Sequence, residues 1–487
     1  MSAALMVAPA GLPSAASAQD AAELDELIGA LLGDTPMVDD LRELTDSIGG
    51  RVTGTAANEA AVDWALEKFE DAGVSARAES FEMPRLWVER ETRVFVSGDI
   101  EFSPRAVAKH YSALAGADAA PRPLLFLGRG SEADFAAAGS DVEGSWVLIE
   151  TDVVADIDGL FGEYAQSALV EPAAAEAGAA GVAYISSRPM GLLYSLGAML
   201  SADNELPIVV IEREEGLRLK RQLERGATLE LAAVIDASDG SAFQSRNVIA
   251  EIPGTDLADE IIVFGAHLDS YGLGTGANDN GCNVSMLIDI ARQMSRLGVR
   301  PRRTVRFALW NGEEQGFNGS WRYTEAHQEE MEDHVVAASI DIGSGRITGF
   351  WTNGRGGELL APLDRALEPV SGLGPFEHSD DAIFGTDNFD FLINGVANLV
   401  AIHESANYGP NYHAESDTFD KVNQSQLRLN AAIIAAVIYG LANDEALDPP
   451  RHSRAQIEEL VSSTPLEAEM RDWNVYDAWA SGERGRR

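Results

Sequence analysis

The chain has 487 residues, 45% of them hydrophobic and 23% charged, which is typical of a globular protein with two or three domains. Its formal net charge of −42 argues against nucleic acid and anionic membrane surfaces as partners. Beyond the first residues no run of 18 consecutive apolar residues occurs, so no membrane-spanning segment is predicted. The one cysteine, Cys282, excludes an internal disulfide, and the fold must rest on its hydrophobic core.

The first stretch, "MSAALMVAPAGLPSAASAQD", is apolar and built from small residues. Within it, "ASA" before Gln19 resembles an A-x-A cleavage site, although the basic start of a secretory signal is missing. We therefore interpret 1–18 as a signal peptide and expect a periplasmic or secreted protein. A disordered cytosolic leader is the alternative.

The segment 19–114 combines two patterns. Up to about residue 75, apolar residues recur at helical spacing and end on glycines, as in "ANEAAVDWALEKFEDAG". From about 78 to 110, apolar and polar residues alternate, which predicts strands. We assign 19–114 to the N-terminal part of a main domain that resumes at residue 243.

Residues 115–242 are predicted to form a separate α+β unit. "GSWVLIETDV" indicates a strand, "EPAAAEAGAAGVAYIS" a helix running into a strand, and "LPIVVIEREEGLRLKRQLERG" a strand followed by a helix. No cluster of chemically active side chains occurs in this unit, so it is predicted to be an insert without catalytic groups of its own.

Residues 243–447 alternate strands with helices. Predicted strands include "EIIVFGAH", "TVRFALWNG" and "VANLVAIH", and predicted helices include "NVSMLIDIARQMSRL" and "QLRLNAAIIAAVIYGLAN". This alternation predicts an α/β fold with an open, mostly parallel sheet flanked by helices. Ligands of such sheets bind at the carboxyl ends of the strands. The polar tail, 448–487, is predicted to be a surface extension.

Acidic and histidine side chains follow the predicted strands of this domain, each just past a strand end or in the loop beyond it. They are His267, Asp269, Asp279, Glu313, Glu314, Asp341 and His413. Because parallel strands end at the same edge of a sheet, we expect these groups to converge there. So many carboxylates in one place repel one another unless positive charge lies between them.

A pair of divalent cations would resolve that repulsion. Imidazole nitrogen and carboxylate oxygen are both zinc ligands, at roughly 2.0–2.2 Å. With Asp279 as a bridge, each cation would have three protein ligands and room for a shared water. The neighbours Glu313 and Glu314 would then differ in role, since one binds metal and the other takes a proton from the bound water.

Each residue also has an ordinary structural explanation. A lone "HLD" is a weak signal, a Glu-Glu pair is usually a solvated face, and Asp279 lies in a Gly/Asn-rich loop typical of turns. Asp341 could cap a helix, and a single histidine such as His413 is more often surface or core than ligand. Their joint order at successive strand ends is what favours a metal site.

The motifs "GAHLDS", "GANDNG", "NGEEQGFNGS", "SIDIGS" and "NYHAESDTFDKV" together resemble the M28 family of dinuclear zinc exopeptidases. The segment "GTDNFDFLINGVANLVAIHES" is most similar to its carboxypeptidase Q branch, whose members act as aminopeptidases or dipeptidases. The insert, through "AGAAGV" and its apolar pattern, resembles the protease-associated domain that many secreted peptidases carry. The main domain, 19–114 with 243–447, would then be the catalytic one.

The resemblance implies two Zn²⁺ ions per chain and a role for each residue. His267 and Asp341 would hold one ion, Glu314 and His413 the other, and Asp279 would bridge them. Glu313 would be the general acid/base, and Asp269 would orient His267 through its second ring nitrogen. The hydroxyl of Tyr412 would face the oxyanion, with an aromatic core position as the alternative.

The implied activity is hydrolysis of peptides or dipeptides that have a free N-terminus, with the metal-bound water activated by Glu313. Alternatives on the same fold are a related hydrolase, a glutaminyl cyclase with one zinc, and a receptor-like binding module that has lost ligands. Arg355 is expected at the surface, with an anchor for a substrate carboxylate as the alternative. The partners are therefore peptide substrates, and a homodimer stays open.

Overall fold

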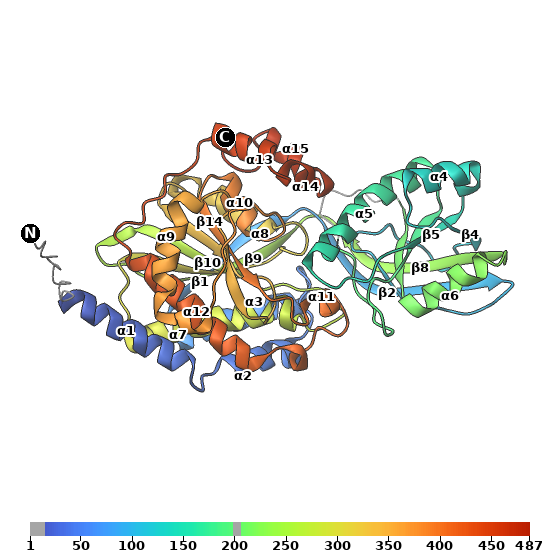
Figure 1. Cartoon of the computed structure of the whole chain (residues 1–487). Helices are drawn as coiled ribbons and strands as arrows, with labels where there is room; N and C mark the ends of the chain where they lie inside the picture. The colour runs from blue at the N-terminus through green and yellow to red at the C-terminus, as the bar shows by residue number, and fades with distance from the viewer. Residues whose placement is uncertain (1–14, 198–205) are drawn as a thin grey trace, which may run out of the picture.

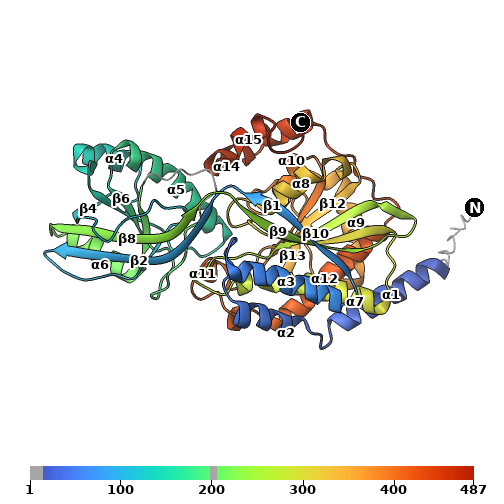
Figure 2. The ribbon, with the colours of Figure 1, turned by 180° about the vertical axis from the view of Figure 1, so that it is seen from behind.

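The computed structural model describes residues 15–197 and 206–487 (Figures 1 and 2). Most of the predicted signal peptide, residues 1–14, lies outside the described part of the chain. Two seven-stranded sheets dominate the molecule, and Figure 1 shows them side by side, with the C-terminus on the larger half.

The first sheet belongs to the larger half, and its four central strands run parallel to one another. Its outer strands pair antiparallel with their neighbours. In spatial order the strands are β1 (Ser75–Met83), β9 (Phe243–Ile252), β11 (Arg303–Trp310), β10 (Leu257–His267), β12 (His334–Ser339), β14 (Ala397–His403) and β13 (Ile347–Trp351). The predicted α/β fold with an open, mostly parallel sheet is confirmed.

Helices cover both faces of this sheet, which explains why its central strands are almost continuously apolar. On one face lie α1 (Ala15–Leu31), α2 (Met37–Arg42), α3 (Ala56–Asp71), α7 (Cys282–Leu297), α9 (Gly356–Leu367) and α12 (Gln424–Asn443). The opposite face packs against α8 (Asn318–Ala326) and α10 (Asn388–Ile393), through side chains such as Tyr323 and Phe391. Cys282 is fully buried in the first of these two layers.

Helix α12 is long and apolar enough to cross a membrane, by length and composition alone. In this fold 72% of its most apolar window is buried inside the protein. It packs against α1, α7 and α9, as the core helix of a folded domain does.

The second sheet forms the smaller half. Its strands, in spatial order, are β2 (Leu86–Gly98), β8 (Leu229–Gly240), β4 (Arg122–Phe126), β5 (Trp146–Glu150), β6 (Gly181–Ile185), β7 (Ile208–Ile211) and β3 (Ala106–Ala108). Helices α4 (Glu132–Ala138), α5 (Ile157–Glu176) and α6 (Arg213–Leu223) pack around it. We call this half the insert.

The insert begins earlier than the predicted boundary at residue 115. Strands β2 and β8 pair along their whole length, from Leu86 opposite Gly240 to Gly98 opposite Leu229. Met83, just before β2, pairs with Phe243, just after β8, in the first sheet. The chain therefore leaves the first sheet after β1, forms the insert, and returns to the first sheet at β9. The alternating pattern of 78–110 correctly predicted strands, but alternation alone does not say to which sheet a strand belongs.

The C-terminal segment, 448–487, predicted to be a surface extension, is docked on the larger half, and most of its residues are exposed or half-buried. Its helices are α13 (Arg454–Ser463), α14 (Leu466–Asp472) and α15 (Tyr476–Ala480). They share an apolar cluster with Phe317 and Phe389, and the buried Arg484 forms two hydrogen bonds to Asp390, of 2.8 and 2.7 Å. Arg355, expected at the surface, is also buried and donates to the carbonyl of Pro450 over 2.6 Å.

Candidate metal centre

The first group of possible metal ligands surrounds His267, the last residue of β10. Its Nε2 lies 3.1 Å from Oδ1 of Asp279 and 3.0 Å from Oδ1 of Asp341. On the other side of the ring, Nδ1 lies 3.0 Å from the main-chain oxygen of Asp269, which fixes the ring's orientation. The three side chains are buried and could hold one metal ion.

A second group shares Asp279 with the first. The Nε2 of His413 lies 3.3 Å from Oδ2 of Asp279 and 2.9 Å from Oε2 of Glu314. In each group the potential ligand atoms lie within 4.8 Å of one another. One oxygen of Asp279 faces each group, so this carboxylate is placed to bridge two ions.

The parallel strands explain why residues so distant in sequence meet here. His267 ends β10, Glu313 and Glu314 follow β11, and Asp341 follows β12, at the same edge of the sheet. The turn that carries the two glutamates is held by Asn311, whose side chain donates to the carbonyl of Arg246 over 2.6 Å. The sequence analysis predicted that these residues converge at one edge of the sheet, and they do. The role of each residue stays a prediction.

The loop that carries Asp279 is held by two residues that sequence reasoning missed. The carboxylate of Asp417 accepts hydrogen bonds from the main-chain N–H groups of Asn278 (2.8 Å) and Asp279 (3.1 Å). Beneath the loop, the buried Arg51 donates to the carbonyls of Leu268 (2.7 Å) and Gly276 (3.0 Å). Asp417 lies four residues after His413 in the motif "NYHAESDT", so the sequence could have pointed to it. No motif in the sequence points to Arg51.

Asp269 touches His267 differently from the prediction. Its carboxylate Oδ1 is 3.7 Å from the His267 ring nitrogen, and the main-chain carbonyl makes the close contact instead. The carboxylate accepts from the hydroxyl of Thr53 over 2.9 Å and from the main-chain N–H of Glu313 over 3.4 Å. Asp269 therefore ties the β10 end to the turn that presents Glu313.

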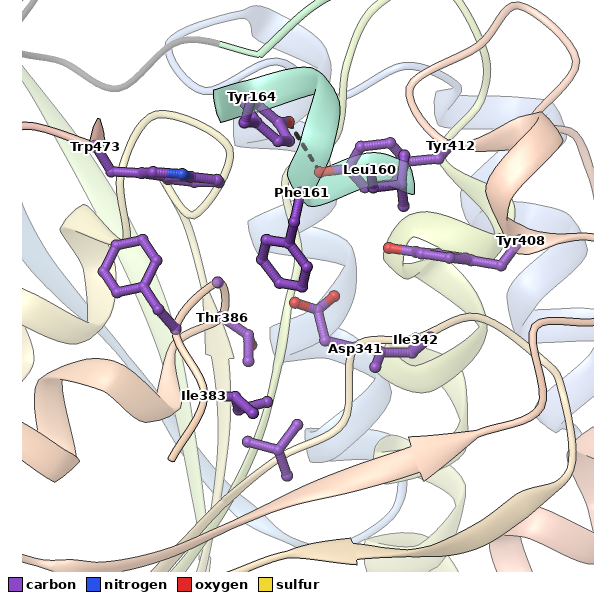
Figure 3. Close-up of a pocket in the computed structure, with 13 residues that line it drawn as sticks. Leu160, Phe161, Tyr164, Asp341, Ile342, Ile383, Thr386, Tyr408, Tyr412 and Trp473 are labelled. Atoms are coloured by element: carbon purple, nitrogen blue, oxygen red, sulfur yellow. Dashed lines mark hydrogen bonds between the residues drawn. The ribbon is translucent and has the colours of Figure 1, made fainter. Parts of the chain in front are cut away.

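Tyr412 lies against the second group. Its ring stacks on the imidazole of His413, with centroids 3.6 Å apart and planes 23° apart. Its hydroxyl is 3.0 Å from that of Tyr164, which comes from α5 of the insert (Figure 3). Figure 3 also shows Tyr408, which sequence reasoning missed, with its hydroxyl end turned toward the pocket that contains Asp341.

The insert holds the loop that carries His413. The main-chain N–H of Ser195 donates to the carbonyl of His413 over 2.9 Å, and that of Glu415 donates to Leu193 over 3.0 Å. The guanidinium of Arg188, fully buried, donates to the carbonyl of Tyr412 over 3.3 Å. His413 itself has a φ of 54°, a conformation that non-glycine residues adopt only when their surroundings enforce it.

The electrostatics of the site call for added positive charge. Burial, reinforced by neighbouring carboxylates, raises the pKa of Glu313 well above its usual value and that of Glu314 to about 7. Burial opposes protonation of His413, but Glu314 and Asp279 outweigh it and raise the pKa of His413 to about 9. Asp387, a buried acid near Asp341 that sequence reasoning missed, also has a pKa raised well above normal by burial.

The donor set fits divalent cations. Oδ2 of Asp279, Oε1 of Glu314 and Oδ1 of Asp341 are buried and accept no hydrogen bond from any described residue. Within 15–197 and 206–487, no lysine or arginine forms an ion pair with these three carboxylates. Buried charges without partners are costly, and an ion among them would supply the missing interaction.

Comparison with known proteins finds a family model that matches part of the larger half. Residues 247–438 match the model of peptidase family M28. Human carboxypeptidase Q is 26% identical over 247 residues, which are 50% of this chain and 52% of that protein. The chain thus spans about half the length of the carboxypeptidase Q relatives it matches.

Three further proteins cover most of the chain. The Mycobacterium tuberculosis protein named "Probable lipoprotein aminopeptidase LpqL" is 26% identical over 457 residues, 85% of each chain. The crystal structure of a peptidase M28 precursor from Shewanella amazonensis SB2B is 25% identical, with a TM-score of 0.81 over 90% of this chain and 99% of that one. A zinc aminopeptidase from Bacillus subtilis shares the fold, with a TM-score of 0.66 and 21% identity, over 85% of this chain and 97% of that one.

Proposed function

We propose that this protein is a zinc-dependent exopeptidase that releases residues from peptides with a free N-terminus. The observation that carries the proposal is the pair of three-residue groups that share Asp279. In this assignment His267 and Asp341 hold one zinc ion, Glu314 and His413 hold the other, and Asp279 contacts both. Imidazole nitrogens and carboxylate oxygens are suitable zinc ligands.

Held by these residues, zinc would supply a Lewis acid for the scissile carbonyl and would lower the pKa of a water to about 7. Glu313 accepts a proton from the attacking water and returns it to the leaving amine. Glu313 is buried next to Glu314, where its carboxylate can accept a proton and later return it. Asp269 steadies both His267 and the turn of Glu313 through the contacts described above.

Two tyrosines are candidates to stabilise the oxyanion. The hydroxyl of Tyr412 is within hydrogen-bond distance of Tyr164, which would hold it in one orientation. Tyr408 lines the same pocket from α11 (Tyr408–Asn411). A neutral hydroxyl donor is retained at both positions, since burial raises the pKa of each well above its usual value.

The names of the relatives support exopeptidase chemistry with a free N-terminus, since they include aminopeptidases and carboxypeptidase Q. A panel of dipeptides and tripeptides, free or N-acetylated, tests it on protein that has been stripped with a chelator and then reloaded with zinc. We expect no hydrolysis by the stripped protein, recovery at two zinc ions per chain, and no hydrolysis of acetylated peptides.

Two results would overturn the proposal. Full activity in the stripped protein would remove the metal from the mechanism. Cleavage of acetylated and free peptides at equal rates would remove the requirement for a free N-terminus. Release of ammonia from N-terminal glutamine, with one zinc per chain, would indicate a glutaminyl cyclase instead.

We further infer that the protein is exported. The predicted signal peptide, 1–18, and the lipoprotein name of the Mycobacterium tuberculosis relative support this location. Mass spectrometry of the protein from cell fractions should find a periplasmic or secreted form that starts near Gln19. A cytosolic form that keeps residues 1–18 would contradict export.

A further inference from the structure

An apolar pocket opens beside the candidate metal centre (Figure 3). Most of the residues that line it are aliphatic or aromatic, among them Leu160, Ile342 and Ile383. Among the described residues that line it, Asp341, one of the possible metal ligands, is the only charged one. The pocket therefore adjoins the first group of possible metal ligands.

Three distant parts of the chain build the walls of this pocket. Helix α5 of the insert contributes Phe161 and Tyr164, and the docked C-terminal segment contributes Trp473. The catalytic domain contributes the loop 383–386. In Figures 1 and 2, α14, which Trp473 follows, lies close to α5 at the junction of the two halves.

The aromatic walls contact one another. The ring of Trp473 lies 4.6 Å from that of Tyr164 and 5.1 Å from that of Phe384, measured between centroids. At Gly385, with a φ of +121°, a Cβ atom would approach the Phe161 ring to 3.3 Å. A larger residue at position 385 would crowd the Phe161 ring, so the loop 383–386 packs tightly against α5. This packing gives the pocket an apolar wall.

We propose that this pocket binds the side chain of the substrate's N-terminal residue and that Trp473 is a specificity-determining residue that selects large apolar side chains. The proposal rests on the exopeptidase function above and names its substrate class. The described residues that line the pocket include no lysine, arginine or histidine that could pair with an acidic substrate side chain. The carboxylate of Asp341, which could pair with a basic one, belongs to a possible metal group. A leucine or phenylalanine side chain would bury its surface against the aromatic rings.

The C-terminal segment therefore takes part in substrate selection. Its docking places Trp473 against the catalytic domain through stacking on Phe317, with centroids 6.1 Å apart and planes 14° apart. The buried pair of Arg484 and Asp390 anchors the end of the same segment. Substrate choice would depend on the insert and the C-terminal segment together.

The test uses the zinc-loaded full chain and aminoacyl p-nitroanilides, in which the N-terminal side chain is the only variable. We expect kcat/KM to be highest for leucine and phenylalanine and to fall for alanine, glutamate and lysine. In Trp473→Ala, kcat/KM for leucine should fall roughly 10- to 100-fold, as for lost contacts in an apolar pocket, and that for alanine much less. Trp473→Phe should recover most of the loss.

Further variants separate pocket effects from misfolding. Phe161→Ala, on the insert wall, should shift selectivity toward larger side chains without touching the C-terminal segment. Trp479→Phe changes a buried ring of the same apolar cluster that does not line the pocket, and it should keep the wild-type selectivity. A Trp473→Ala protein with unchanged selectivity, or with altered choice of only the second residue in dipeptides, would overturn the proposal.

Failure of the exopeptidase function gives a different result. If the wild type hydrolyses none of the substrates, calorimetric titration with leucinamide, phenylalaninamide and glutamic acid amide tests the pocket alone. Binding of the two apolar amides that weakens in Trp473→Ala would support the pocket. No binding, or preference for the acidic amide, would overturn it.

Discussion

The two sheets of this protein have the same layout, with parallel central strands and antiparallel outer ones, yet their strand ends differ in chemistry. In the first sheet, carboxylates and imidazoles at the strand ends face one another without lysine or arginine partners among the described residues. In the insert, charged strand-end residues are matched. Asp152 pairs with Arg129, Arg188 with Glu163, and Glu212 caps the start of α6.

The comparison of the two sheets shows that the same strand layout does not by itself produce a metal site. In the insert these strand-end charges have protein partners, so they need no ion. In the first sheet the charges are left unbalanced, which favours cation binding. Variants that alter each kind of strand end should therefore have different consequences.

The largest effect is expected from the unmatched glutamates. In Glu313→Gln, kcat should fall roughly 10³-fold because the proton acceptor is lost, whereas KM and zinc content stay near wild type. The matched control is its neighbour, since Glu314→Gln should reduce the zinc content. Steady-state kinetics with metal analysis on both proteins checks this. Equal zinc loss in both variants would show that the two residues do not differ in role.

A smaller effect should follow from breaking the link between the insert and the His413 loop. In Arg188→Met the hydrogen bond to the Tyr412 carbonyl is lost, and zinc affinity at the Glu314–His413 group should fall roughly 10- to 100-fold. Affinity at the His267–Asp341 group should hardly change. Competition with a zinc chelator at several concentrations resolves the two sites.

Two control proteins sharpen this test. The double variant Arg188→Met with Glu163→Gln removes the unpaired buried carboxylate that would otherwise destabilise the insert. Arg129→Met breaks an exposed pair with Asp152, which should change neither zinc affinity nor stability measurably. Equal weakening of both zinc sites in the double variant would contradict a specific role for the insert.

The smallest effect is expected at a strand end whose hydrogen bonds lie wholly within the insert. Thr151 follows β5, and its hydroxyl donates to the carbonyl of Ile185 over 2.6 Å. Thr151→Val should lower the free energy of unfolding by about 1 kcal/mol and leave kcat/KM unchanged. Thermal unfolding and kinetics on the same preparation check both. A large loss of activity would show that the insert's own strand ends matter to catalysis.

Much of this molecule could be predicted because local pattern and chemistry agree. The continuous apolar strands predicted the first sheet. The acidic and histidine residues past the strand ends predicted that His267, Asp279 and His413 lie at one edge of it. The roles of Arg51 and Asp417 could not be predicted, because they hold the Asp279 loop through main-chain groups that no spacing reveals. Docking of the C-terminal segment could not be predicted for a similar reason, since Trp473 contacts Phe317 and Phe384, which are more than 80 positions away.

The proposed central feature of the site is a carboxylate, Asp279, that two cations would share. Crystals of the zinc-loaded protein, measured at the zinc absorption edge, test it most directly. The account predicts two anomalous peaks, one beside His267 and Asp341 and the other beside Glu314 and His413, with Asp279 between them. A single peak, or zinc bound elsewhere with these side chains still facing one another, would contradict it.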